Sequence, residues 1–286
     1  MAINKEIPVI FDCHDQPLLG IIHQCDHPAS TGVLVIVGGP QHRTGSHRQF
    51  ILLARHLAAE QIPCMRFDAR GMGDSAGESR NFNEIDDDIR AAIDCFFTTC
   101  PELKNVVLWG LCDAASAALF YAYQDSRVKG LILLNPWVFT QQGAAKTYLK
   151  HYYLQRLANR EFWKKILLFR FDYTNSVSSF LNFLRLARTV NKQQATRIAD
   201  DLPLPLRMRK CLRQFAHPVL LILSGRDLTA SEFKETVKAD SEWQALLKDP
   251  RVSRQDFEAA DHTFSSAQWR EQVAKWTTDW LKAIAD

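Results

Sequence analysis

Three side chains that could do chemistry together each follow a segment that is expected to be a β-strand. Cys112, Asp227 and His262 come after the segments 106–109, 219–223 and 252–257. A nucleophilic thiol, a histidine base and a carboxylate that orients the histidine are the three parts of a catalytic triad. In an open parallel sheet the carboxyl ends of the strands share one edge, where ligands bind. The pattern therefore predicts Cys112, His262 and Asp227 as catalytic residues that meet at this edge.

Cys112 lies in a pattern that is typical of a nucleophile elbow. The usual form is Gly-x-Ser-x-Gly, and residues 110–114 read Gly-Leu-Cys-Asp-Ala between an apolar run and a stretch of small helix-forming residues. The turn strains the backbone of the central residue, so the residues two positions away on each side must be small. The positive end of the following helix favours the thiolate, which is the reactive form.

Each of the three residues also has a simpler interpretation when it is taken alone. Cys112 could be a buried core cysteine, Asp227 could be a helix cap, and His262 could be a surface residue of a loop. The order nucleophile, acid, histidine is the order of a known triad arrangement, and all three follow strands. This agreement favours the catalytic interpretation over three separate coincidences.

An acyl-transfer site also needs two donors for the developing oxyanion. The first is expected to be the backbone N–H of Asp113, the residue after the nucleophile. The second should come from the loop after the strand 33–37, and Pro40 has no N–H, so Gly39 is the first candidate and Gln41 the second. The Asp113 carboxylate would raise the thiol pKa if it pointed inward. We expect it to turn away from Cys112, or to bind a cation or a substrate amine.

Strand and helix patterns alternate along most of the chain and predict the fold class. Residues 6–12 and 18–24 read as a hairpin, and further strands are expected at 33–37, 64–67, 106–109, 130–134, 219–223 and 252–257. Amphipathic helices are expected around 50–57, 85–96 and 269–284. This alternation predicts an α/β fold with a doubly wound, mostly parallel sheet.

The alternation breaks down in an aromatic and basic segment that we interpret as a helical lid or cap insertion. We expect core residues 1–137 and 216–286, with the insertion at 138–215. Residues 146–213 carry a net charge of +11, whereas the rest of the chain carries −8. The simplest explanation is amphipathic helices with solvated basic faces. The alternatives are a lid that selects an anionic substrate, and peripheral contact with an anionic membrane.

Composition narrows the setting and the partners. Seven scattered cysteines without CxxC spacing indicate reduced thiols, and the N-terminus has no apolar core of a signal peptide. We therefore expect a cytoplasmic protein. It would be peripheral to the inner membrane if the basic segment binds lipid. The basic charge has no nucleic-acid-binding motif beside it, which argues against that partner. We predict no metal and no cofactor. The oligomeric state is left open.

Several stretches together resemble the α/β-hydrolase superfamily, and more closely the type 1 hydrolase associated with the bacterial exosortase A system. They are Gly38-Gly39-Pro40-Gln41, residues 44–50, 66–68 and 70–75, residues 110–117, and Asp261-His262-Thr263-Phe264. The resemblance covers the whole chain and implies the α/β-hydrolase fold. It also implies a setting in exopolysaccharide production, without naming a substrate.

The sequence thus predicts a hydrolase that cleaves an ester or thioester of a small acyl substrate through an acyl-cysteine intermediate. Two alternatives remain open. The same intermediate could be transferred to an alcohol, as in an acyltransferase. A catalytically silent scaffold could instead bind a ligand or a partner, and side chains far apart in the folded protein would favour this interpretation.

Overall fold

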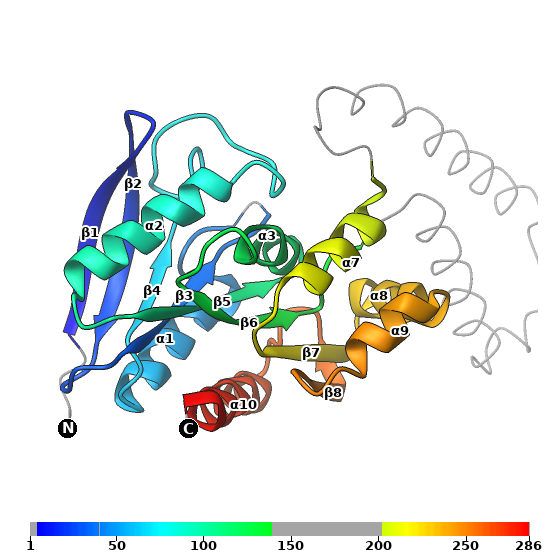
Figure 1. Ribbon diagram of the computed structural model, residues 1–286. Coiled ribbons are helices and arrows are strands. Elements are labelled where there is room, and N and C mark those ends of the chain that lie inside the picture. Colours follow the sequence, from blue (N-terminus) through cyan, green and yellow to red (C-terminus); the bar gives the residue numbers. More distant parts are fainter. Residues whose placement is uncertain (1–4, 40, 139–201, 286) are drawn as a thin grey trace, which may run out of the picture. The chain divides into compact units, whose positions relative to one another are not determined.

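The computed structural model describes residues 5–39, 41–138 and 202–285. This part of the chain forms an eight-stranded sheet in the order β1-β2-β4-β3-β5-β6-β7-β8, shown in Figure 1. Strand β2 pairs antiparallel with both β1 and β4, and all other pairs are parallel. The strands are β1 Lys5–Cys13, β2 Gln16–Gln24, β3 Thr31–Ile36, β4 Cys64–Phe67, β5 Asn105–Leu111, β6 Val128–Leu134, β7 Val219–Arg226 and β8 Val252–Asp261.

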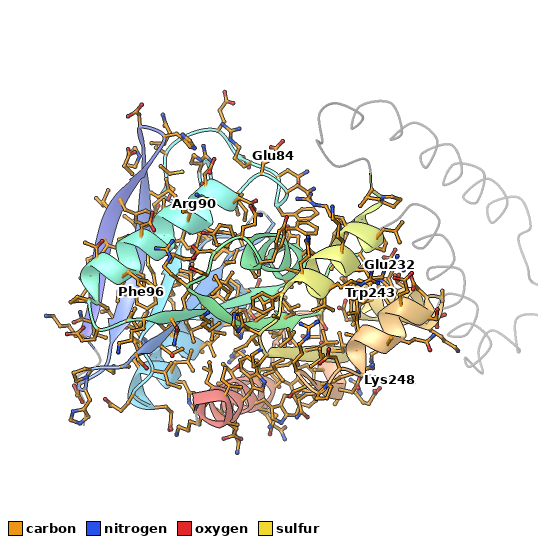
Figure 2. The ribbon with its side chains drawn as sticks, in the orientation of Figure 1. Glu84, Arg90, Phe96, Glu232, Trp243 and Lys248 are labelled. Carbon is orange, nitrogen blue, oxygen red and sulfur yellow. The ribbon has the colours of Figure 1, made fainter. Side chains whose placement is uncertain are left out.

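Helices lie on both faces of this sheet, as a doubly wound fold requires (Figure 1). Helices α1 and α10 pack on one face against alternate residues of the central strands, and α2 and α3 lie on the other face. Phe96 of α2 and Trp243 of α9 are both buried and are labelled in Figure 2. The helices are α1 Gln49–Ala59, α2 Asp86–Thr99, α3 Asp113–Ala122, α7 Leu204–Gln214, α8 Leu228–Lys238, α9 Ser241–Leu247 and α10 Ala267–Ala285, with a short 3₁₀ turn η1 at Ser46–Arg48.

The predicted α/β-hydrolase sheet is confirmed, with one difference at its far edge. Strands β7 and β8 run further than expected, to Arg226 and Asp261, instead of stopping at Leu223 and Phe257. Their register shifts between Ser224 and Arg226. A Cβ atom on Gly225 would lie only 2.3 Å from the Glu258 carbonyl oxygen. The glycine therefore permits a close approach of the two backbones, and the strand pairing continues past Ser224 and Gly225.

The predicted insertion falls largely on residues outside the described part of the chain. Residue contacts divide the chain into one unit of Met1–Val138 with Met208–Asp286 and a second unit of Phe139–Arg207. Within the first unit, Arg209 and Arg213 of α7 form ion pairs with Asp240 and Glu242. These basic side chains are thus paired internally. The interpretation as a lid that selects an anionic substrate or contacts a membrane therefore stays a prediction. None of the described helices is long and apolar enough to cross a membrane.

Candidate active site

The strained turn expected around Cys112 is present between β5 and α3. Cys112 has φ 63° and ψ −122°, a positive φ that is costly for a residue with a side chain. A Cβ atom on Gly110 would lie 2.5 Å from the Ala114 carbonyl oxygen. The turn therefore closes only because residue 110 is a glycine. It leaves the Cys112 side chain partly exposed at the start of α3.

His262 lies between the other two predicted triad residues. Its Nδ1 is 3.0 Å from Oδ2 of Asp227, and the side chains are 35% and 7% exposed. Hydrogen bonds of the His262 ring to the side chains of Asp227 and then Cys112 raise the pKa of His262 to about 10. Both partners favour the protonated ring because each can carry a negative charge. The structure thus brings the three predicted side chains together, with the histidine partly exposed and the carboxylate buried.

Asp227 is also the N-cap of α8, so this carboxylate caps a helix and contacts His262 at the same time. Its carboxylate oxygens accept hydrogen bonds from the backbone N–H groups of Thr229 and Ala230, at 3.2 Å and 3.0 Å. The same Oδ2 atom that bonds Ala230 faces His262. Capping fixes the carboxylate in place, and the helix N-terminus stabilises its charge. A fixed carboxylate holds the imidazole ring in one orientation.

Asn135 and Ser224 form a buried pair under His262 that the sequence did not reveal. Asn135 donates from Nδ2 to Ser224 Oγ at 2.9 Å and to the His262 carbonyl oxygen at 3.0 Å, and its Oδ1 accepts from the Ser224 N–H at 2.8 Å. Ser224 Oγ donates to the Asp261 carbonyl oxygen at 2.8 Å. These bonds join the ends of β6, β7 and β8. Asn135 directly follows the expected strand 130–134, and nothing in the local sequence indicates its hydrogen bonds.

The Asp113 carboxylate contacts the loop that follows β3. Its Oδ2 accepts a hydrogen bond from the Gly39 N–H at 2.8 Å, and its Oδ1 accepts from the Ala114 N–H at 3.0 Å. Burial raises the pKa of this carboxyl group. This contact corrects the expectation that the Gly39 N–H is the free second donor. The reason is that the Asp113 carboxylate, 74 residues further along the chain, already accepts a hydrogen bond from the Gly39 N–H.

Gln41 is left as the candidate for the second donor. Among the described residues, its backbone N–H has no hydrogen-bond partner. It lines the same cleft as Gly39 and Asp113, which has a volume of about 500 Å³. The cleft therefore borders both remaining predicted donors, the backbone N–H groups of Asp113 and Gln41.

Two ion pairs hold the walls of this cleft. Asp68, fully buried, accepts from the Arg43 N–H at 2.6 Å and pairs with the Arg43 guanidinium. Arg70 binds buried Asp88 through Nε and Nη2, at 3.0 Å and 2.8 Å. Both arginines and both aspartates have partners, which indicates a structural role for the loop 68–75. The contacts fix the segments that lead to Gln41 and to Met72 in the cleft wall.

Comparison with known proteins agrees with this architecture. A model of the alpha/beta hydrolase family matches residues 33–276. A search of curated proteins gives no match.

Among solved structures, the Pyrococcus furiosus esterase Pf2001 is similar at 16% identity with a TM-score of 0.66, covering 98% of this chain and 93% of that one. Est1E from Butyrivibrio proteoclasticus, solved with ferulic acid bound, is similar at 14% identity with a TM-score of 0.64, covering 97% and 99%. GrgF from Penicillium sp. sh18, described as an alpha/beta hydrolase, is similar at 16% identity with a TM-score of 0.63, covering 98% and 99%. At these identities the likeness supports the shared fold alone.

The family match spans most of the chain, from β3 into α10. The eight-stranded sheet and the turn after β5 are the features this fold uses to present a nucleophile. The chain therefore belongs to the alpha/beta hydrolase family, and it is a hydrolase in fold and class.

Proposed function

We propose that the protein hydrolyses an ester or thioester through an acyl-Cys112 intermediate. The observation that carries this proposal is the hydrogen-bonded row of Asp227, His262 and Cys112 at the carboxyl ends of β7, β8 and β5. The His262 ring, held by Asp227 beside the thiol, can accept the Cys112 proton during attack and deliver it to the leaving group. No metal or cofactor is needed for this chemistry.

The reaction would proceed in two halves. Sγ of Cys112 attacks the carbonyl carbon, and the oxyanion forms beside the N–H groups of Asp113 and Gln41. The C–O or C–S bond then breaks, and the leaving group takes a proton from His262. In the second half a water gives a proton to His262 and attacks the acyl group, which releases the carboxylic acid and restores Cys112. Asp227 holds the ring and stabilises its charged form throughout.

Acyl transfer to an alcohol would share the first half of this reaction, so an acyltransferase stays the nearest alternative. The silent scaffold is disfavoured because its condition, separated side chains, conflicts with the 3.0 Å contact between His262 and Asp227. The exopolysaccharide setting rests on the resemblance to the exosortase-associated hydrolase, and the lid residues that would select an anionic substrate lie outside the described part.

Intact-protein mass spectrometry after incubation with activated esters and thioesters tests the proposal. We expect a transient acyl adduct on Cys112 that is absent in Cys112→Ala and slow to form or clear in His262→Ala. Cys95→Ala is the matched control, because Cys95 is also a partly exposed free thiol but lies on α2. Full turnover in Cys112→Ala, or an adduct lost equally in Cys95→Ala, would contradict the assignment.

A further inference from the structure

The side chain of Asp113 bridges two elements that build the oxyanion site. One oxygen binds the Gly39 N–H in the loop after β3, and the other binds the Ala114 N–H in the first turn of α3. The first bond crosses between segments 74 residues apart in the chain, and it is a charge-assisted hydrogen bond of 2.8 Å. The carboxylate thus ties the loop directly to the nucleophile turn.

Gly38 shows that the loop is shaped around this carboxylate. A Cβ atom at residue 38 would lie 2.0 Å from Asp113 Oδ1 and 2.8 Å from the Ala114 nitrogen. Any side chain at this position would collide with the carboxylate and with the start of α3. Gly39, with φ 58°, then turns its N–H toward the second carboxylate oxygen. The two glycines and Asp113 form one fitted contact.

The Gln41 N–H, which has no partner within the described ranges, is only two residues from the anchored Gly39. Pro40 between them contributes no donor, and a proline ring restricts its own backbone rotation. Fixing Gly39 therefore limits where the Gln41 N–H can lie. A donor shifted by about 1 Å can lower a rate by about 100-fold, so such an anchor matters for catalysis.

A carboxylate near a developing oxyanion would normally oppose catalysis by like-charge repulsion. Here its two oxygens are each engaged by a backbone N–H, and the N-terminus of α3 adds a positive end charge. These contacts offset its charge locally. The repulsion between the carboxylate and the oxyanion is thereby reduced, and the gain from holding the loop in place outweighs it.

Resting on the acyl-cysteine function proposed above, we infer that the Asp113 side chain is a positioning residue that anchors the Gly38–Gln41 loop and sets the Gln41 N–H as the second oxyanion donor. The same residue then acts twice. Its backbone N–H is the first donor, and its side chain places the second.

The test compares two reactions of Cys112 that differ in their need for an oxyanion site. Acylation by an activated ester builds an oxyanion, whereas alkylation by iodoacetamide does not. Both rates are measured for the wild type, Asp113→Ala and Asp113→Asn. We expect acylation to fall by about 100-fold in Asp113→Ala with alkylation within a few-fold of the wild type. Asp113→Asn keeps an oxygen that can accept from the Gly39 N–H, so it should retain most of the acylation rate.

Other outcomes overturn the inference. Acylation as fast as or faster than the wild type in Asp113→Ala would mean that the carboxylate is neutral or blocks the donor. A parallel loss of both reactions in both variants would mean that Asp113 acts on the thiol or on the fold. A wild type that alkylates but never acylates at Cys112 would overturn the proposed function itself. The two failures are therefore distinguishable.

Discussion

The two sides of the proposed active site are built by different means. The acid–base side, at the ends of β6, β7 and β8, is held by side-chain hydrogen bonds of Asn135, Ser224, Asp227 and His262. The nucleophile side, at the ends of β3 and β5, is held mainly by backbone geometry: a strained Cys112, and glycines whose missing Cβ atoms let the segments touch. The Asp113 carboxylate adds two hydrogen bonds to backbone N–H groups there. The acid–base side thus depends on polar side chains, whereas the nucleophile side depends mainly on glycines that leave room where a Cβ atom would collide.

This difference separates function from folding. A polar side chain can be replaced by a similar one that keeps its structural bonds and loses its charge. A glycine in a close contact has no such replacement, because any added atom changes the backbone. Substitutions on the acid–base side should therefore reduce activity with little structural change, while substitutions of the close-packed glycines on the nucleophile side should affect stability and activity together.

The largest expected effect comes from Asp227→Asn. Asparagine is as good an N-cap as aspartate, so α8 should stay intact. The neutral amide can no longer stabilise a protonated His262, and turnover of an activated ester should fall by about 10⁴-fold, as expected for the loss of a triad carboxylate. Steady-state kinetics measure the fall, and thermal unfolding checks the fold.

Asp240→Asn is the matched control for Asp227→Asn. Asp240 caps α9 in the same way, accepting from the N–H groups of Glu242 and Trp243. We expect unchanged turnover in this variant. A similar fall in both variants, or no fall in Asp227→Asn, would break the distinction between a cap and a triad carboxylate.

Gly110→Ala probes the backbone side with a smaller expected effect on rate. The added methyl group would lie 2.5 Å from the Ala114 carbonyl oxygen, so the turn must open. We expect a loss of about 1–3 kcal/mol in the free energy of unfolding, as for other overpacked sites. Displacing Cys112 from His262 should also lower turnover by about 100-fold.

Gly32→Ala is the control, because it introduces a similar steric clash far from the proposed active site. Its methyl group would lie 2.7 Å from the Phe96 ring, near the start of β3 and away from the carboxyl ends of the strands. We expect a comparable loss of stability with unchanged turnover for each folded molecule. Equal losses of turnover in the two variants would show that global destabilisation, rather than the geometry of the turn, accounts for Gly110→Ala.

The fold, and the meeting of Cys112, His262 and Asp227, could be predicted from the sequence because both depend on residue types at strand ends. Apolar runs and the small residues around Cys112 express local needs that a sequence displays directly. The Gly39–Asp113 bond and the Asn135–Ser224 pair join residues 74 and 89 positions apart, and nothing local marks them. Gly39 looked like a free donor because a backbone N–H carries no sign of its partner.

The smallest expected effect is a pH dependence of stability on the acid–base side. The folded state raises the pKa of His262 from an ordinary value of 6.5 to about 10. A group with a raised folded pKa stabilises the fold fully below pH 6.5, and that contribution is lost as the pH rises through 10. The free energy of unfolding of the wild type, minus that of His262→Gln, should therefore shrink across this range.

Urea unfolding of both proteins between pH 6 and pH 10 measures this difference. Groups elsewhere titrate in both proteins and cancel in the subtraction. The His262 side chain is about a third exposed, so water screens the contact and the change should be modest. Gly32→Ala, which alters packing away from His262, should show a constant deficit across the same range. A difference for His262→Gln that does not vary with pH would mean that packing holds the acid–base side as well, and the contrast between the two sides would disappear.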